Sequence, residues 1–249
     1  MAQSDMRDNL KLNHYTDSDL QYYKRLSRPK QLNHKIATVS ATMVALPVFI
    51  QAPWVRLAPI SASIFTTILL ASGILIECWG PDDWRERGVL LVGFSGSWLG
   101  GCLFWGWYRL HPVWHLPLEG FALPLAIAGL NSRWRLASFF YLASLGGTAI
   151  TDAIIGIIGL MDLWPIVLSA SVEEAPNLLQ KAAKTTLQPG VIPIILFAGL
   201  GLIYLSRTLW RRRSHPGWPV AASALATTLV VDSLFLITAL ISPQLSGLI

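Results

Sequence analysis

Three carboxylates lie inside long apolar runs of the sequence, where a charged side chain is costly. Glu119, Asp152 and Asp232 each fall within a stretch that is close to the roughly 20 apolar residues needed to cross a bilayer. A central charge costs about 2.5–3.5 kcal/mol on insertion scales, so such residues usually face a bundle interior and hold a partner or a proton. These acids are therefore candidates for a proton-relay or substrate-binding site, and structural pairing between helices is the alternative.

Polar groups that can pair with these acids occur close to them in the sequence. His115 precedes Glu119 by four residues, which places both on one face if the segment is helical. Thr148 precedes Asp152 by four residues and can donate a hydrogen bond to it from one turn away. For His115, an interfacial or capping role, a proton partner of Glu119 and a pigment or haem ligand all stay open. Two cations from the same side complete the candidate set: Arg56 and Arg109.

The composition indicates that these residues belong to a membrane protein. The chain has 249 residues, of which 53% are hydrophobic and 13% charged, and its mean hydropathy is +0.50. Soluble domains carry about 25% charged residues, so this chain has too few polar side chains to cover a water-soluble globule. The same numbers exclude a collagen, a disordered tail and a disulfide scaffold.

Apolar runs predict an all-α, polytopic transmembrane bundle of about seven spans. The expected spans are Ile36–Pro53, Leu57–Ile76, Val89–Trp107, Val113–Leu130, Leu136–Met161, Val191–Trp210 and Trp218–Ile241. The first and fourth are the weakest, because prolines interrupt them. At a rise of about 1.5 Å per residue, Asp152 and Asp232 each lie about 14 Å from the outer end of their spans. Glu119 starts its span at the outer side, so the sequence permits one cluster in the outer half.

The distribution of basic residues predicts the orientation of these spans. Fifteen of the nineteen Lys and Arg fall on segments that face one side when the spans alternate. They are Arg7, Lys11, Lys24, Arg25, Arg28, Lys30, Lys35, Arg85, Arg87, Arg133, Arg135, Arg207, Arg211, Arg212 and Arg213; Arg56, Arg109, Lys181 and Lys184 face the other side. Cytoplasmic flanks carry the excess of Lys and Arg, so we expect a cytoplasmic N-terminus and an outside or lumenal C-terminus.

Three regions follow from this topology. Residues 1–35 form a polar, basic cytoplasmic tail without the apolar core of a signal peptide, and its charge favours anionic headgroups over nucleic acid. Residues 36–241 form the transmembrane domain, and residues 242–249 a short C-terminal tail. The longest outer loop predicts an amphipathic helix at Val172–Leu187, which follows a capping-box pattern beginning at Ser171.

Motifs of hydrolytic and metal enzymes do not occur in the sequence. HExxH, GxSxG, CxxC and DDxxD are all absent, and nothing argues for an enzyme, a metal or a cofactor. Most of the eleven tryptophans fall near predicted span ends, which is typical of an aromatic belt. The glycines of Gly93–Gly101 are spaced for close helix packing.

Four segments resemble an uncharacterised cyanobacterial family of multi-spanning membrane proteins. They read ALPVFIQAPWVR (45–56), WGWYRLHPVWHLPLE (105–119), FYLASLGGTAITD (140–152) and VDSLF (231–235). The chain departs from the family at His111, where an acid is more frequent. The resemblance implies no activity. It implies a setting, the thylakoid or plasma membrane of an oxygenic phototroph.

Two functions are compatible with the sequence, and the sequence favours the first over the second. The first is an accessory factor that assembles or stabilises a photosynthetic or respiratory membrane complex, with subunits of that complex and the lipid bilayer as partners. The second is a proton- or cation-coupled carrier of small solutes that uses Asp152 and Asp232, with Glu119 and His115 at its outer entrance. No charged residue continues such a path through the inner half, and no inverted repeat is visible.

Overall fold

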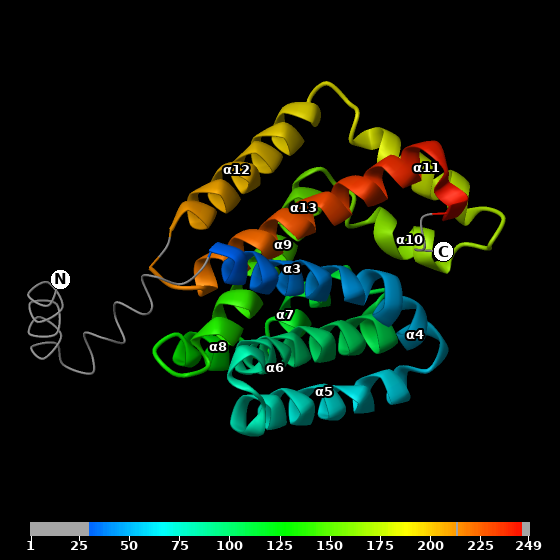
Figure 1. Ribbon diagram of the computed structural model, residues 1–249. Coiled ribbons are helices and arrows are strands. Elements are labelled where there is room, and N and C mark those ends of the chain that lie inside the picture. Colours follow the sequence, from blue (N-terminus) through cyan, green and yellow to red (C-terminus); the bar gives the residue numbers. More distant parts are fainter. Residues whose placement is uncertain (1–29, 213, 246–249) are drawn as a thin grey trace, which may run out of the picture.

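The computed structural model describes residues 30–212 and 214–245, and this part of the chain is built from helices without strands (Figure 1). The long helices are α3 (Lys30–Leu46), α5 (Pro59–Trp79), α6 (Asp82–Leu103), α9 (Arg135–Ile157), α12 (Ile192–Arg211) and α13 (Gly217–Ile241). The shorter elements are η1 (Pro47–Gln51), α4 (Ala52–Leu57), η2 (Phe104–Tyr108), η3 (Pro112–Trp114), α7 (His115–Glu119), α8 (Leu123–Gly129), α10 (Leu163–Ser169), α11 (Ala175–Thr185) and η4 (Pro243–Leu245). The predicted tail lies outside the described residues up to residue 29, as do residues 246–249.

Six helices in the described ranges are long and apolar enough to cross a membrane. They cover His34–Leu57, Pro59–Trp79, Asp82–Tyr108, Arg135–Ile157, Ile192–Arg211 and Gly217–Ile241. They coincide with six of the seven predicted spans. The chain is therefore an integral, multi-pass, all-α membrane protein, and the predicted fold class is confirmed.

The remaining predicted span, Val113–Leu130, is a broken passage and not one helix. It consists of η3, α7 and α8, with a turn between Glu119 and Leu123. Its prolines explain the break, because each of these elements has a proline within its first three residues, where a missing N–H is tolerated. The passage still reaches the opposite end of the bundle, since Arg133 pairs with Glu77 near the end of α5 at an N–O distance of 3.6 Å.

The first crossing, by contrast, stays helical through its prolines. α3 continues through the π-helical turn η1 directly into α4, although Pro47 and Pro53 lie in this segment. A wider π turn accommodates a proline because it frees the backbone positions that the ring blocks. The turn also carries Gln51 into the interior, where 1% of its surface is exposed.

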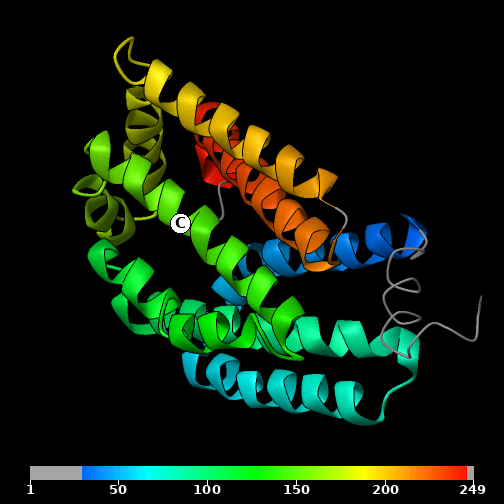
Figure 2. The ribbon, with the colours of Figure 1, turned by 90° about the vertical axis from the view of Figure 1, so that its left-hand side faces the viewer.

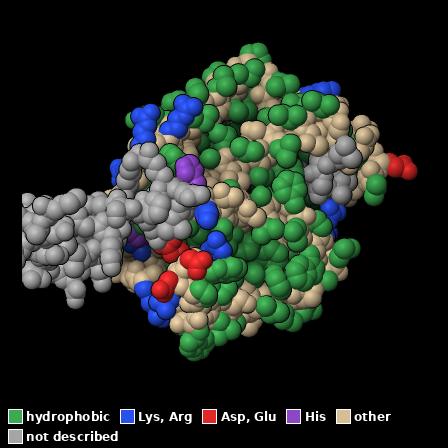
Figure 3. All heavy atoms as spheres, in the orientation of Figure 1, with side chains coloured by type: hydrophobic (Ala, Val, Ile, Leu, Met, Phe, Trp, Pro, Cys, Tyr) green, Lys and Arg blue, Asp and Glu red, His purple; other side chains and the backbone are tan. Residues whose placement is uncertain are grey.

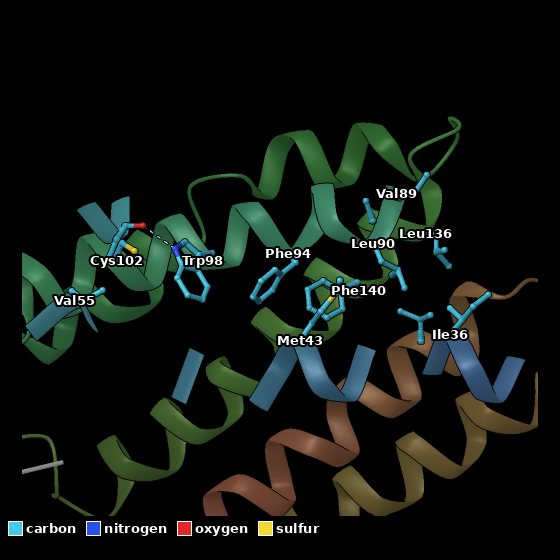
Figure 4. Close-up of a cluster of buried hydrophobic side chains, with 13 residues drawn as sticks. Ile36, Met43, Val55, Val89, Leu90, Phe94, Trp98, Cys102, Leu136 and Phe140 are labelled. Carbon is cyan, nitrogen blue, oxygen red and sulfur yellow. Dashed lines mark hydrogen bonds between the residues drawn. The ribbon is translucent and has the colours of Figure 1, made fainter. Parts of the chain in front are cut away.

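The helices form two pairs with α3 and α9 between them. α5 packs on α6 and α12 packs on α13, and α9 contacts both α6 and α13 (Figure 2). Buried side chains of α3, α6 and α9 make the main core, in which Phe94 and Phe140 lie close to Met43 (Figure 4). Gly93 allows this packing, because a Cβ there would lie 2.7 Å from the carbonyl oxygen of Ala137.

Basic side chains gather at one end of the bundle, which we call the basic end (Figure 3). It holds Arg85, Arg87, Arg133, Arg135, Arg207 and Arg211, whereas the opposite or far end holds Arg56, Arg109, Lys181 and Lys184. These two groups of basic residues lie at opposite ends of the bundle, as the distribution of Lys and Arg in the sequence predicts. That the basic end faces the cytoplasm stays a prediction.

The far end carries two short helices outside the crossings. α11 lies within the predicted amphipathic segment but begins later, at Ala175, one residue before Pro176. The Ser171 hydroxyl bonds the Glu174 N–H at 3.3 Å and the Glu174 carboxylate at 3.1 Å, so the capping pattern forms the turn that precedes the helix. α10 was not predicted, and it carries Trp164 towards the site described next.

Candidate functional site

His115 lies between two of the predicted carboxylates. Its Nδ1 is 3.0 Å from both carboxylate oxygens of Asp152 on α9. Its Nε2 is 3.3 Å from Oε1 of Glu119, one turn further along α7. We call these three residues the imidazole–carboxylate cluster. The helical spacing predicted the pair within α7, and the tertiary structure adds Asp152.

The cluster is largely shielded. The side chains of His115, Glu119 and Asp152 are 16%, 21% and 12% exposed. The Phe104 ring lies against the imidazole with its centroid 4.3 Å away, and Trp164 closes another side at 6.5 Å. Such surroundings have a low dielectric constant, so an unpaired charge here would be costly and each charge pair is strong.

Both ring nitrogens of His115 meet a carboxylate, which bears on the protonation of the cluster. A neutral imidazole has one N–H, whereas Nδ1 lies beside Asp152 and Nε2 beside Glu119. An imidazolium between two carboxylates, or a neutral imidazole with one protonated carboxyl, would make both contacts hydrogen bonds. The arrangement thus has room for one proton more than a neutral imidazole beside two ionised carboxylates carries.

α7 is positioned by its neighbours α6 and α9. The Tyr141 hydroxyl of α9 donates to the Glu119 carbonyl oxygen and accepts the Ala122 N–H at 3.1 Å. On the other side, a Cβ at Gly100 would lie 2.8 Å from the Cα of Glu119. α7 therefore packs directly on Gly100 of α6, and the turn after α7 is hydrogen-bonded to Tyr141 of α9. These contacts fix the position of His115 and Glu119 in the cluster.

Asp232 of α13 lies beside this cluster, because it is bonded to Thr151, the neighbour of Asp152 in the chain. The Thr151 hydroxyl donates to Oδ2 of Asp232 at 2.6 Å, and Asp152 is the following residue of α9. The two aspartates thus lie on adjacent helices and at one level. Thr148, the predicted donor, forms no hydrogen bond within the described part of the chain. The donor is Thr151, and its partner is Asp232 rather than Asp152.

Arg56 and Arg109 are not in contact with the cluster. Both line a separate cavity of about 200 Å³ at the far end, together with His111. Arg109 is linked to the cluster indirectly, because its carbonyl oxygen accepts the Trp164 indole N–H at 2.8 Å. Of the seven predicted residues, the structure brings three into one cluster, places Asp232 beside it and separates the two arginines and Thr148.

A second buried polar group, Gln51, was missed by sequence reasoning. Its amide nitrogen donates to the Trp98 carbonyl oxygen and lies 3.0 Å from Sγ of Cys102, both on α6. A polar residue between two prolines in an apolar run was the available signal. Because its partners are backbone and thiol groups, Gln51 links α6 to η1 and does not exchange protons.

The cluster is not arranged as a metal site. Both imidazole nitrogens are already in contact with carboxylates, which leaves the ring no free ligand atom. Within residues 30–212 and 214–245, no group of three or more His, Cys, Asp and Glu side chains has the geometry to hold a metal ion. Direct proton exchange is the chemistry that this arrangement supports.

Comparison with known proteins identifies a family and no characterised relative. No curated protein and no solved structure matches the chain. The family match covers residues 40–240, which include the cluster, the far-end cavity and all of the crossing helices except the first residues of the first one and the last residue of the last one. The chain belongs to DUF3120, a family described as proteins of unknown function.

Proposed function

We propose that this protein is a proton-coupled carrier of a small solute, and that the imidazole–carboxylate cluster is its proton-binding site. The observation that supports the proposal is the position of His115, whose two nitrogens meet Asp152 and Glu119 inside a membrane protein. Ionisable residues within membrane domains are typical of proton relays and coupled transporters. In the setting that the sequence resemblance implies, the carrier serves a thylakoid or plasma membrane of a cyanobacterium.

In the proposed mechanism the cluster takes up one proton. This proton offsets one of its two carboxylate charges while the site is closed by Phe104 and Trp164. Opening towards the far end lets this proton exchange with the outer solution. Asp232 is the neighbouring acceptor at the same level, because Thr151 holds its carboxylate beside α9.

Movement of the broken passage can supply the opening. α7 and α8 are short helices joined by a turn, and they rest on α6 and α9 through few side-chain bonds. Discontinuous helices that line a buried ionisable site are a recurring feature of secondary transporters. A shift of α7 would separate His115 from Asp152 and change the affinity for the proton.

The test is proton flux in proteoliposomes. Purified protein is reconstituted with a pH-sensitive dye inside, and a panel of small anions, cations and neutral solutes is applied across a proton gradient. We expect one class to drive proton movement through the wild type, and Asp152→Asn to abolish it while the protein still folds. The matched control is Asp162→Asn, which changes an exposed acid at the same end.

Two outcomes would contradict the carrier. Full coupled flux in Asp152→Asn would show that the cluster does not carry the proton. A folded wild-type protein that moves no proton with any solute of the panel would remove the basis for transport altogether.

The accessory role is the second candidate, and α12 is the observation that favours it. This helix packs mainly on α13, and only 6% of its most apolar stretch is buried inside the protein. Phe197 and Tyr204 are 82% and 75% exposed, so a partner helix has a wide apolar face to contact. Mass spectrometry of proteins that co-purify in digitonin tests this: stoichiometric subunits of a photosynthetic or respiratory complex support it, and an isolated protein contradicts it.

A further inference from the structure

The far end carries a cationic cavity that the proposed proton site does not use. The cavity has a volume of about 200 Å³ and lies where the turn between α4 and α5 meets η2. Its ionisable lining residues are Arg56, Arg109 and His111, and none of the acids in the described ranges lines it. Two of the four basic residues at the far end therefore converge on one small cavity.

The two guanidinium groups have no partners in the part of the chain that the structure describes. Among the described residues, neither Arg56 nor Arg109 forms an ion pair or a side-chain hydrogen bond. Arginines at the basic end contrast with them, since Arg85 pairs with Asp82 at 3.4 Å and Arg133 pairs with Glu77. Both residues thus bring unpaired positive charge to one cavity, and an oxyanion bound there would supply the missing counter-charge.

The local backbone is built for a close approach at this point. Gly106 lies in η2, and a Cβ there would be 3.1 Å from Cβ of Pro59 and 3.3 Å from Cγ1 of Val55. The absent side chain lets η2 approach the start of α5, and this brings the Arg109 segment beside Arg56. The Arg109 backbone is also anchored, because its carbonyl oxygen accepts the Trp164 indole N–H at 2.8 Å.

We propose that this cavity binds a phosphate-type oxyanion, with Arg56 and Arg109 as its main ligands and His111 at its edge. Guanidinium groups present paired N–H donors that match the oxygen spacing of phosphate. The anion is either a free ion or the headgroup of an anionic lipid, since the far end of the helices lies at the membrane surface in the predicted topology. The inference does not depend on proton movement at His115.

Direct binding to the full-length, purified protein in detergent tests the proposal. Radiolabelled inorganic phosphate is measured by scintillation proximity, and unlabelled short-chain phosphatidylglycerol is used as the competing lipid headgroup. We expect Arg56→Gln and Arg109→Gln each to weaken binding by about tenfold, the effect of losing one charge-assisted contact. Lys181→Gln removes the same charge from the same end outside the cavity and is expected to bind like the wild type.

The outcomes separate the two sources of anion. Saturable phosphate binding that requires both arginines identifies a site for a free anion. If only phosphatidylglycerol binds, detected by native mass spectrometry and lost in the same variants, the ligand is a lipid headgroup. Arg56→Lys retains the positive charge but lacks the paired N–H donors of a guanidinium, so it should bind with intermediate affinity. This result would show that the weaker binding of the Gln variants comes from the lost contact and not from misfolding.

Three results would overturn the proposal. The first is a folded wild-type protein that binds neither probe. The second is binding that survives both arginine substitutions, and the third is an equal loss in Lys181→Gln. None of these results bears on proton flux, so the proposed carrier function is judged separately.

Discussion

The two halves of the bundle hold their helices together by different means. In the far half, α7, α9 and α13 meet through ionisable side chains, namely the imidazole–carboxylate cluster and the Thr151–Asp232 bond. In the basic half, α3, α6, α9 and α13 meet through glycine contacts, aromatic rings and hydroxyl bonds to backbone. Those bonds run from Ser40 to the Val220 carbonyl at 3.0 Å and from Ser223 to the Ala37 carbonyl at 2.6 Å.

This difference separates packing from chemistry. Small residues and hydroxyl-to-carbonyl bonds are the usual means of joining helices in lipid, and both join α3, α6, α9 and α13 in the basic half. The far half places three acids and a histidine in the same lipid-embedded bundle. Charged groups in such a position are costly unless they are paired, so the stability of the far half depends on how these residues pair.

The largest expected effect comes from removing His115, the only basic side chain in the imidazole–carboxylate cluster. His115→Leu leaves Asp152 and Glu119 facing each other without a cation, and should lower the free energy of unfolding by about 3–5 kcal/mol. Chemical unfolding in detergent micelles measures it. The double variant His115→Leu/Asp152→Asn should recover part of the loss, because one of the two uncompensated carboxylates is gone. Equal stability of His115→Leu and the wild type would contradict the charge pairing.

The next largest effect tests the close helix packing of the basic half. Gly93→Val places side-chain atoms against the Ala137 backbone, which cannot move aside, and should cost about 1–3 kcal/mol. Gly146→Val is the matched control on α9, since nothing lies within 4 Å of a Cβ at that residue. The same unfolding assay applies. Equal losses in the two variants would mean that helix propensity, and not packing, sets the cost.

The smallest effect compares one hydroxyl bond in each half. Ser223→Ala removes a neutral bond between helices and should cost about 0.6 kcal/mol, whereas Thr151→Val removes a bond to a carboxylate and should cost up to about 1.7 kcal/mol. Ser233→Ala is the control, because its hydroxyl bonds only the Leu229 carbonyl of its own helix. A larger loss in Ser223→Ala than in Thr151→Val would reverse the proposed contrast between the halves.

The crossings were predictable from the sequence because the membrane imposes their length and polarity. Continuous apolar runs and the positions of Lys and Arg located six of the seven predicted spans. The broken form of the segment Val113–Leu130 was not predictable, because the prolines of the first crossing and those of this segment look alike in the sequence. The first crossing accommodates its prolines through the π turn η1, which packs on α6. The segment Val113–Leu130 instead breaks into short helices, among them α7 and α8.

The candidate site was only partly predictable. The spacing of His115 and Glu119 follows from one helical turn, and the sequence was sufficient for it. Whether Asp152 or Asp232 would complete the site depends on how α9 and α13 are rotated, which their sequences leave open. The choice of Thr151 over Thr148 depends on the same rotation, since the two hydroxyls are about 60° apart on a helix that turns about 100° per residue.

The sequence by itself determined that this chain is a multi-pass helical membrane protein with ionisable groups in one half, because lipid tolerates only long apolar helices and penalises isolated charges. The tertiary structure decided which of those groups meet. It joined His115, Glu119 and Asp152, placed Asp232 beside them and moved Arg56 and Arg109 into a cavity of their own. Contacts between helices depend on their rotation and on close approach at Gly100 and Gly106, and these are set by packing across the whole bundle.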